Sequence, residues 1–331
     1  MGRALAFSDD EIIRLATEEY IAVTGDDWYQ RRRRDAEGDF FRRVVNQNPH
    51  KAPEGQSRQG LYCFTASGKL LAYKNHQDAE SVREMLEQGL AAWNRLPNSV
   101  RRPGVVKVPE PGKLDARYTR TPPVGGLVLN VFTRILDRDR QGKCVKGSCS
   151  FAGGDLSARD HLWLKQGEWR RLVPATAKKG DQFEMPATVA ERLLCYHLVD
   201  NTRGEPPFWA SKDIRAKRLT WTVVQATAQD LRLRLDGNVL LATNENPAKA
   251  RRGYEARLLG YLHYDRVRKI IDRLDVVAFG DHWGEGEYTP GARPGRKPLG
   301  IALELSAGKQ AADRVPPEAA RDLEDYLGRD R

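Results

Sequence analysis

The chain has few cysteines, no long apolar run and none of the common cofactor or nucleophile motifs. Only 4 of its 331 residues are cysteine, which excludes the disulfide-dense framework of small secreted domains. No stretch approaches the roughly 20 apolar residues that cross a bilayer, so we expect no membrane span. The patterns G-x-G-x-x-G, G-x-S-x-G and H-E-x-x-H and the P-loop are absent. No nucleotide-cofactor motif therefore points to an activity.

The start of the chain also lacks a targeting signal. Asp9 and Asp10 come too early for a secretory signal peptide. Four cysteines without a dense pattern fit a reducing compartment, so the sequence as written predicts a cytoplasmic protein. A processed form of an exported protein would look the same.

The chain does contain enough apolar material for a folded core. Hydrophobic residues make up 40% of the sequence, and aromatic residues are spread along it, which excludes wholesale disorder. The length corresponds to one large domain or two modest ones.

Basic residues outnumber acidic ones, but the excess is local. The 55 Lys and Arg residues against 45 Asp and Glu give a net charge of +10, of which +7 falls in residues 101–150. The run Arg31–Arg34 is flanked by five acidic residues, so we interpret it as a solvated, internally paired face. A basic protein can bind nucleic acid, but the local distribution of the charge does not favour such a partner here, and the basic connector is the one candidate surface that the sequence offers. Aromatic residues do not interleave with Lys and Arg in the pattern of a sheet that reads RNA.

A change in composition divides the chain. Residues 97–125 contain six prolines and three glycines, which predicts a basic connector between residues 1–96 and residues 126–331. Before the connector the pattern favours helices, and after it short β-like runs dominate.

The first part is predicted to mix helices with a β-hairpin. Ser8 or Asp9 can cap a first helix, and Ala66-Ser67-Gly68 forms a turn between two strands. The expected elements are a helix over 11–20, a strand over 21–24, a helix over 37–47, strands over 61–65 and 69–73, and an amphipathic helix over 78–96.

This order of elements over residues 8–96 resembles a thioredoxin-like domain. The stretch GLYCFTASGKLLAYKNHQDAESVREMLEQGLAAW is similar to the closing half of that fold, with Gly68 as the hairpin glycine. Two features of the family are missing: the Cys-x-x-Cys motif, and the active-site proline, near whose place Gln59-Gly60 stand. Cys63 lies inside a strand and matches neither redox cysteine. The resemblance therefore implies a degenerate domain that serves as a scaffold or a binding module.

The second part is predicted to be β-rich. Thr188 and Glu191 form a capping box for a helix that ends near residue 198, and Asp236-Gly237-Asn238 reads as a hairpin turn. The expected β runs are 126–136, 161–164, 169–173, 218–226, 230–235, 238–243, 256–264, 269–279 and 299–305, with a final helix over 318–327. The fold class is thus α+β: a degenerate thioredoxin-like α/β domain, then a larger, mostly antiparallel β sandwich or part-barrel with an inserted helix.

Polar residues gather after the inserted helix, in CYHLVDNTRGEPPFW. One interpretation is a half-buried helix terminus, with His197 near the C-terminal dipole and Asn201 as a cap. The other is a pocket for an anionic or polar ligand, in which His197, Asp200 and Arg203 take part.

The segment FGDHWGEGEYTPGARPGRKPLG combines glycines, prolines and ionisable side chains, and we expect it to be a loop. Asp281, His282 and Glu285 could bind a divalent metal or act as acid and base. Neighbours in an extended chain tend to point apart, so a metal site would need a partner such as His263 or His197. The alternative is a covering loop in which Trp283 packs.

Cys144 and Cys149 are the only closely spaced cysteines. Four intervening residues allow a hairpin disulfide, a thiol switch or half of a metal site, and Lys143 and Lys146 would favour thiolates. Cys63 and Cys195 are expected to be small buried apolar residues.

Four functions follow from these patterns, of which nucleic-acid binding through the connector is named above and ranks last. The leading hypothesis is a non-enzymatic binding protein that holds a small ligand or a protein segment in a polar pocket of residues 126–331. Its predicted ligand-binding residues are His197, Asp200, Asn201, Arg203 and Trp283. The rivals are a metal-dependent or acid/base enzyme using His282, Asp281 or Glu285, and a thiol redox accessory protein using Cys144 and Cys149.

Overall fold

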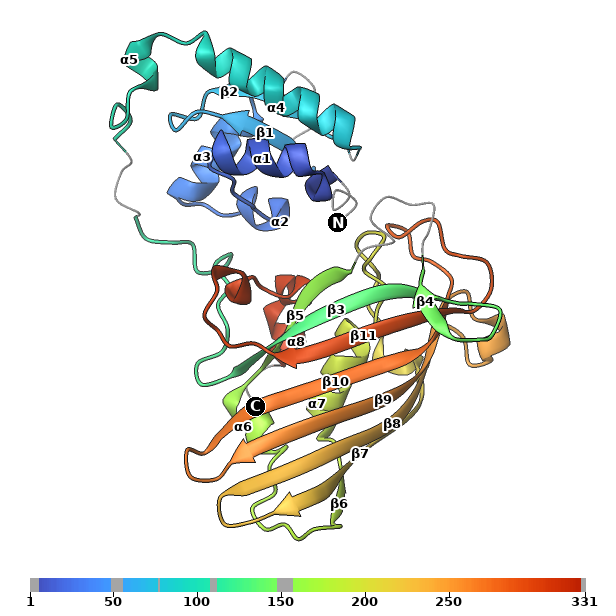
Figure 1. Cartoon of the computed structure of the whole chain (residues 1–331). Coiled ribbons are helices and arrows are strands. Elements are labelled where there is room, and N and C mark those ends of the chain that lie inside the picture. Colours follow the sequence, from blue (N-terminus) through green and yellow to red (C-terminus); the bar gives the residue numbers. More distant parts are fainter. Residues whose placement is uncertain (1–5, 49–55, 77, 108–111, 148–156, 329–331) are drawn as a thin grey trace. The chain divides into compact units, whose positions relative to one another are not determined.

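The computed structural model shows two compact units (Figure 1). It describes residues 6–48, 56–76, 78–107, 112–147 and 157–328. The N-terminal unit spans Arg3–Arg120, and the C-terminal unit spans Thr121–Arg331. The boundary lies inside the segment predicted to be a connector, close to its C-terminal end.

The N-terminal unit packs helices around one β-hairpin. Its elements are η1 (Ala6–Ser8), α1 (Asp10–Glu18), α2 (Asp27–Gln30), α3 (Ala36–Val45), β1 (Leu61–Phe64), β2 (Leu70–Lys74), α4 (Ala79–Asn94) and α5 (Asn98–Arg101). The two strands pair antiparallel. Ala6, Ile12 and Val82 form a small buried cluster where α1 meets α4.

Local capping and turn chemistry explain these boundaries. The Asp9 carboxylate accepts hydrogen bonds from the first backbone amides of α1, and Asp78 does the same for α4. Gly68 adopts φ +84° in the hairpin turn, a conformation that favours glycine. The predicted helices and hairpin of this unit are confirmed to within about two residues at each end.

One predicted strand of this unit is wrong. Residues 21–24 form no strand, and the Ile21 and Val23 side chains are 94% and 71% exposed. A β-branched run favours a strand only where a partner strand and a buried face are available, and the described part of this unit provides neither for it. The hairpin and closing helix that carry the thioredoxin-like resemblance are present, and the resemblance itself stays a prediction.

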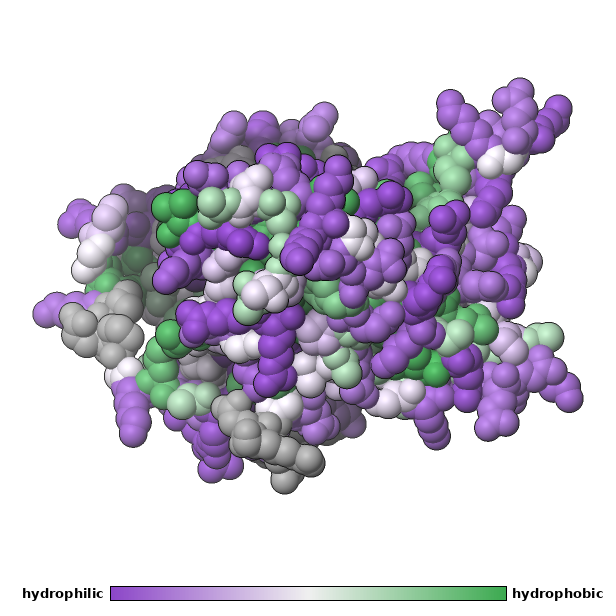
Figure 2. Space-filling view, turned by 90° about the horizontal axis from the view of Figure 1, so that it is seen from below, coloured by the Kyte–Doolittle hydropathy of each residue, from purple (hydrophilic) through white to green (hydrophobic). Residues whose placement is uncertain are grey.

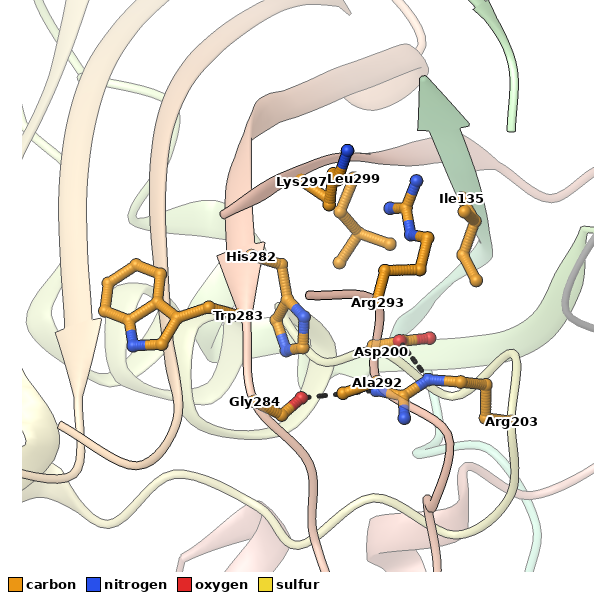
Figure 3. Close-up of a pocket in the computed structure, with 10 residues that line it drawn as sticks. All are labelled: Ile135, Asp200, Arg203, His282, Trp283, Gly284, Ala292, Arg293, Lys297 and Leu299. Atoms are coloured by element: carbon orange, nitrogen blue, oxygen red, sulfur yellow. Dashed lines mark hydrogen bonds and ion pairs between the residues drawn. The ribbon is translucent and has the colours of Figure 1, made fainter. Parts of the chain in front are cut away.

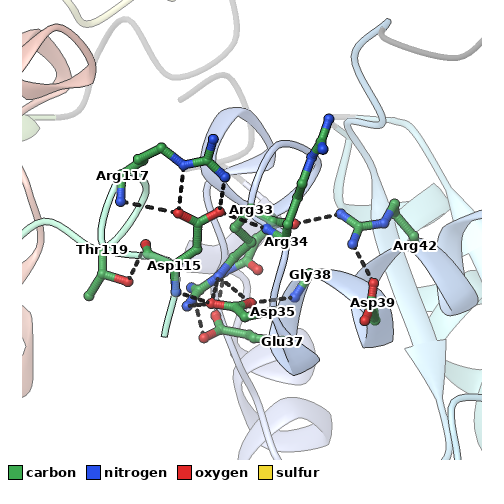
Figure 4. Close-up of polar contacts among 11 residues, drawn as sticks. Arg33, Arg34, Asp35, Glu37, Gly38, Asp39, Arg42, Asp115, Arg117 and Thr119 are labelled. Atoms are coloured by element: carbon green, nitrogen blue, oxygen red, sulfur yellow. Dashed lines mark hydrogen bonds and ion pairs between the residues drawn. The ribbon is translucent and has the colours of Figure 1, made fainter. Parts of the chain in front are cut away.

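Part of the predicted connector is bound to the N-terminal unit (Figure 4). The Asp115 amide donates to the Asp35 carboxylate, and the Asp115 carboxylate accepts from the Arg34 amide and the Arg117 guanidinium. Asp35 also pairs with Arg33 over 2.7 Å. The Arg33 hydrogen bond, more than any other contact, holds the pKa of Asp35 well below its usual range. Residues around Asp115 are therefore anchored rather than free.

The C-terminal unit contains one large antiparallel sheet. Its strands are β3 (Leu127–Arg138), β4 (Cys144–Lys146), β5 (Ala158–Leu164), β6 (Gln182–Glu184), β7 (Ile214–Ala226), β8 (Asp230–Ala242), β9 (Gly253–Asp265), β10 (Ile270–Trp283) and β11 (Lys297–Leu305). The order is β4-β3-β11-β10-β9-β8-β7-β6, with β5 also paired to β3.

Short helical segments complete this unit. They are α6 (Gln166–Arg170), α7 (Ala187–Arg192), the π-helical turn η2 (Leu193–His197), η3 (Ser211–Asp213), η4 (Pro247–Lys249), η5 (Ala311–Arg314), η6 (Glu318–Arg321) and α8 (Leu323–Leu327). Figure 1 shows the sheet curving around α7, which lies on one side of it. The predicted combination of helices with a large antiparallel sheet is confirmed.

The core lies between this curved sheet and the helical segment. Alternate residues of the long strands, such as Leu231, Leu233 and Leu235 of β8, are fully buried on the inner face. Val189 and Leu194 of α7 and η2 belong to the same apolar cluster. The period-2 alternation thus separates a filled inner face from an outer face that is accessible to solvent.

Several predicted elements of this unit are corrected. Residues 169–173 are not a strand, because Trp169 belongs to α6. The inserted helix begins after Pro186 rather than at a cap on Thr188. The final helix is divided at Asp322 into η6 and α8.

The predicted turn at Asp236-Gly237-Asn238 is also wrong. Strand β8 continues through these residues, and the connection from β7 is at 227–229. A Cβ atom on Gly237 would lie 2.6 Å from Leu219 of β7. Gly237 therefore leaves room for the Leu219 side chain of the paired strand instead of forming a turn.

A buried polar network attaches the C-terminal segment to α7. Arg192 forms a bidentate ion pair with Glu168 over 2.5 and 2.7 Å, and also donates to the Tyr326 and Trp163 carbonyls. The Tyr326 hydroxyl accepts from the Trp163 amide. The ring of Tyr326 is buried together with Ala320, so this network fixes α8.

No described helix is long and apolar enough to cross a membrane. In the face shown in Figure 2, hydrophilic residues predominate and hydrophobic residues form small, separate patches.

Candidate functional site

The loop after η2 contains a buried ion pair. The Asp200 carboxylate accepts from the Thr202 amide and hydroxyl through one oxygen and from Arg203 Nε, 2.9 Å away, through the other. Burial acts to raise the pKa of Asp200, but His282, Arg203 and Thr202 outweigh it, so the pKa is lowered. Asp200 is therefore an anion inside the fold.

Arg203 joins this loop to the one that follows β10 (Figure 3). Its Nη1 donates to the carbonyls of Thr289 and Pro290, and its Nη2 donates to Gly284. The Arg203 guanidinium is almost fully buried, and it donates hydrogen bonds to three carbonyl groups and one carboxylate. The sequence predicted that Asp200 and Arg203 share a site, and the structure brings them into direct contact.

His282 completes the cluster from the end of β10. The sequence predicted that His282 lies in a loop, and this prediction is wrong. Strand β10 extends to Trp283 and pairs His282 with Tyr254 of β9. The imidazole is buried and points toward Asp200 (Figure 3). Burial lowers the pKa of His282, an effect that Asp200 partly opposes. His282 is thus a neutral side chain at neutral pH.

These groups surround a very small cavity. Its volume is about 10 Å³, roughly the room for one water molecule. Arg293, Lys297 and Leu299 line it together with the ion pair and His282. Pockets for drug-sized ligands have volumes of about 300–1,000 Å³, so this cavity is too small for an organic ligand. The side chains around it join the two loops of the fold.

A larger depression lies at the surface near η3. Its volume is about 370 Å³, and its lining is polar, with Lys212, Asp213, Arg215 and Asn244 among its residues. It lacks the aromatic and apolar lining of ligand pockets, and no predicted site residue lies in it.

Acidification is expected to destabilise the protein through His282. Because burial lowers its pKa, the unfolded chain, with a histidine pKa of about 6.5, binds more protons than the folded protein. The free energy of unfolding therefore falls below about pH 6.5, by at most about 1.4 kcal/mol per pH unit for this residue. Urea unfolding between about pH 7 and pH 5 should show a smaller loss for His282→Gln than for the wild type.

Burial also lowers the pKa of His161, so this residue adds a loss of stability on acidification that is common to the wild type and His282→Gln. Asp200 and His263 titrate differently. The lowered pKa of Asp200 means that its contribution is lost only below about pH 4. His263, whose pKa is raised by Asp272 and Asp230 against the effect of burial, contributes stability that is lost as the pH increases. An equal loss in the wild type and in His282→Gln would contradict the assignment.

The residues predicted as metal ligands or acid/base groups do not converge. Asp281 faces the opposite side of β10 from His282 and pairs with Arg138 over 2.9 Å. Glu285 is half exposed, accepts from the Ala292 amide and lies 3.9 Å from Arg203, and no contact joins it to His282 or Asp281 among the described residues. His263 lies on the outer face of β9, between Asp230 and Asp272. Within the described residues, no group of three His, Cys, Asp or Glu side chains could hold a metal ion.

His197 belongs to a different cluster from His282. Its Nε2 shares a hydrogen bond of 2.9 Å with the Tyr326 hydroxyl, and its Nδ1 lies 3.4 Å from Asp160. The His197 and Tyr326 rings are both buried. The predicted pocket that combines His197 with Asp200 and Arg203 is therefore not formed.

Asn201 and Trp283, also predicted to bind a ligand, do not line a cavity that is large enough for one. Asn201 is buried beside Asp200. The Trp283 ring points away from the cavity (Figure 3), donates to the Ala250 carbonyl and packs beneath Arg296 at 4.0 Å. The alternative interpretation of Trp283 as a packing residue fits these contacts.

The cysteine hypothesis is answered only in part. Cys144 is exposed on β4 and is not in a disulfide, whereas Cys149 lies outside the described residues. Cys63 and Cys195 are buried, as predicted. Burial raises the pKa of both thiols, that of Cys195 to about 11, so both are protonated at neutral pH.

The outer face of the sheet carries a second arrangement that the sequence did not reveal. One row of cross-strand neighbours runs from β3 to β7 and consists of Arg134, Gly300, Phe279, Arg257, Asn238 and Arg218. We call it the arginine row. Arg134, Arg257 and Arg218 are exposed and make no hydrogen bond or ion pair with any residue that the structure describes.

An apolar row lies beside the arginine row. It consists of Phe132, Ala302, Val277 and Leu259, each two positions along its strand from the arginine row. Val277 and Leu259 are 49% and 42% exposed. One aromatic residue, Phe279, lies in the arginine row, next to Arg257. Only the strand register, which relates residues over 100 positions apart, places Arg134 and Phe279 on the two sides of Gly300 in one row.

Comparisons with protein-family models, with curated proteins and with solved structures found no match to this chain. The candidate site therefore depends on the geometry alone.

Proposed function

We propose that the protein is a non-enzymatic binding protein whose C-terminal unit binds an anionic macromolecule on the outer face of its sheet. The observation that carries this proposal is the arginine row, in which Arg134, Arg257 and Arg218 are exposed and make no hydrogen bond or ion pair with a described residue. Beside it lies the apolar row, of which Val277 and Leu259 are exposed. The polar cluster of Asp200, Arg203 and His282 then supports the fold behind this face.

The distribution of ion pairs makes the outer face locally basic. Four acidic residues of this face each pair with an arginine: Asp236 with Arg234, Asp275 with Arg273, Asp281 with Arg138, and Glu255 with Arg296. The charges within these pairs cancel. Glu304, on the same face, has no ion pair with a described residue and offsets one of the three cations of the arginine row, which still leaves a local excess of positive charge. Unpaired guanidiniums are available for phosphate, sulfate or carboxylate groups.

The inner face offers no comparable surface. It is filled by α7, η2 and the buried side chains of the strands, and the cavity near His282 has room for about one water molecule. The acid/base alternative gains nothing from this geometry, because Asp281 and His282 point to opposite sides of β10.

Retention on immobilised heparin tests the proposal. The wild type should need more salt for elution than a variant carrying Arg134→Gln, Arg218→Gln and Arg257→Gln. Each arginine that is removed lowers the number of counterions that heparin releases when the protein binds. Each substitution of an exposed, unpaired residue should change the free energy of unfolding by only about 0.5 kcal/mol, so the variant should remain folded.

A matched control removes the same charge elsewhere. Arg140, Arg171 and Arg251 are also exposed in the C-terminal unit and lie outside the outer-face rows. Their triple Gln variant should elute close to the wild type. Equal elution of the two triple variants would reject the outer face as the binding surface.

A further inference from the structure

We propose that the anionic macromolecule is a single-stranded nucleic acid that lies across the strands of the outer face. This inference rests on the proposed function and names the partner of the same surface. In it, phosphates contact the arginine row and bases stack against the neighbouring aromatic and apolar side chains.

The spacing of the arginines suits a polymer rather than a single small anion. Adjacent strands are about 4.8 Å apart, so Arg134 and Arg257, three strands apart, are separated by about 14 Å. Arg257 and Arg218 are two strands apart, or about 10 Å. One small anion cannot reach all three guanidiniums, whereas a strand of linked phosphates can follow the row.

The apolar row lies at a distance that a nucleotide can span. Residues two positions apart on a strand are separated by about 7 Å, which places Val277 beside Phe279 and Leu259 beside Arg257 on the same face. Bases bind to proteins by stacking on aromatic rings or guanidinium planes, without a requirement for particular sequences. The two rows therefore offer a charged edge next to an apolar edge, and a base can stack on Phe132 or Phe279 or on an arginine guanidinium and make apolar contacts with Val277 and Leu259.

Aromatic rings with associated guanidiniums lie within this surface. Arg159 lies 5.5 Å from the centre of the Phe132 ring, and Arg138 lies 5.9 Å from that of Phe279. Tyr261, two positions beyond Leu259 on β9, is 42% exposed. Aromatic and arginine side chains on one sheet face are the means by which sheet-based modules bind single strands.

The centre of the surface is flat. Gly300 lies between Arg134 and Phe279 in the arginine row, and Ala302 lies next to it in the apolar row. A Cβ atom on Gly300 would approach only the end of the Leu136 side chain, at 3.2 Å. A strand of nucleic acid can thus cross β11 beside the Leu136 side chain of β3, without meeting a large side chain of β11 itself.

The acidic residue Glu304 limits the surface on one side. It follows Ala302 by two positions on β11, and no described residue forms an ion pair with it. The Glu304 carboxylate lies on the far side of the apolar row, where its negative charge repels phosphates. A backbone bound to this face should therefore lie along the arginine row, with its bases toward the apolar row.

Fluorescence anisotropy with labelled oligothymidine of about 12 nucleotides tests the inference. The full chain should bind this probe more tightly than it binds polyphosphate, poly-glutamate or vesicles of phosphatidylglycerol. Changing Val277, Leu259 and Phe279 together to threonine should weaken oligothymidine binding by about tenfold or more, since it removes the ring of Phe279 on which a base stacks and the apolar contacts of Val277 and Leu259. Polyphosphate binding should stay within about twofold, because the three arginines remain.

The arginine variant reports the charged edge of the same surface. With Arg134, Arg218 and Arg257 changed to glutamine, the slope of log affinity against log salt should decrease by about 2, near 0.7 for each lost phosphate contact. The matched apolar control changes Val267, Val315 and Tyr288, which are exposed elsewhere in the C-terminal unit, to threonine. It should bind oligothymidine like the wild type, and thermal melting checks that each variant is folded.

The outcomes separate this inference from the proposed function. If the arginine variant loses polyphosphate binding, but the threonine variant binds oligothymidine normally or another polyanion binds equally well, the nucleic-acid inference is overturned and the anion-binding surface stands. If the wild type binds none of the probes, both are overturned. If changing Arg102, Lys107 and Lys113 abolishes binding while the arginine variant does not, the connector is the site and the inference is wrong.

Discussion

Replacing Arg203 with methionine is expected to lower the free energy of unfolding by about 3–5 kcal/mol. The substitution leaves the Asp200 carboxylate buried without its cation and removes the hydrogen bonds that Arg203 donates to Thr289, Pro290 and Gly284. Both the loop after η2 and the loop after β10 lose their junction. Chemical unfolding at neutral pH measures the change.

A double variant identifies the cause of this loss. If the uncompensated charge dominates, Asp200→Asn combined with Arg203→Met should cost less than the sum of the two single substitutions, with a coupling of about 0.5–3 kcal/mol. Additive losses would mean that the two side chains act independently, contrary to the contact between them. A loss below about 1 kcal/mol in Arg203→Met would show that the junction is not formed in solution.

Replacing Arg192 with methionine is expected to have an effect of similar size, about 3–5 kcal/mol. Arg192 is the only cation in contact with Glu168 among the described residues, and both side chains are buried. Its loss also removes the donors to the Tyr326 and Trp163 carbonyls. Because Tyr326 belongs to α8, hydrogen exchange should increase most in the C-terminal segment.

An apolar replacement of the whole pair is the control for this prediction. Arg192→Met with Glu168→Leu should recover much of the stability, since removing both charges also removes the buried, unpaired carboxylate. If the double variant is as unstable as the single one, the hydrogen bonds to α8 rather than the carboxylate determine the effect. Unchanged exchange in α8 would contradict the network described for Tyr326.

Local sequence signals predicted the elements that local chemistry determines. Asp9 and Asp78 cap α1 and α4 as side-chain acceptors, and Gly68 supplies the conformation of the β1–β2 turn. Elements that depend on tertiary contacts were not predictable in the same way. Ile21 and Val23 have high strand propensity but no partner strand, and Gly237 resembles a turn residue but admits Leu219 of a neighbouring strand.

The candidate site also combines contacts that the local sequence predicts with contacts that depend on the tertiary structure. Asp200 and Arg203 are three residues apart, so their proximity could be inferred from the sequence. That His282 joins them, while Asp281 points away, follows from the strand alternation that places His282 on the inner face. The arginine row could not be found in the sequence, because Arg134, Arg218 and Arg257 become neighbours only through the register of six strands.

Ultraviolet cross-linking of bound oligothymidine, with the adducts located by mass spectrometry, tests the central claim most directly. The outer-face surface predicts adducts on Phe132, Phe279 or Tyr261, and their loss when Arg134, Arg218 and Arg257 are changed to glutamine. Adducts confined to residues 97–125 or to the N-terminal unit would contradict the claim.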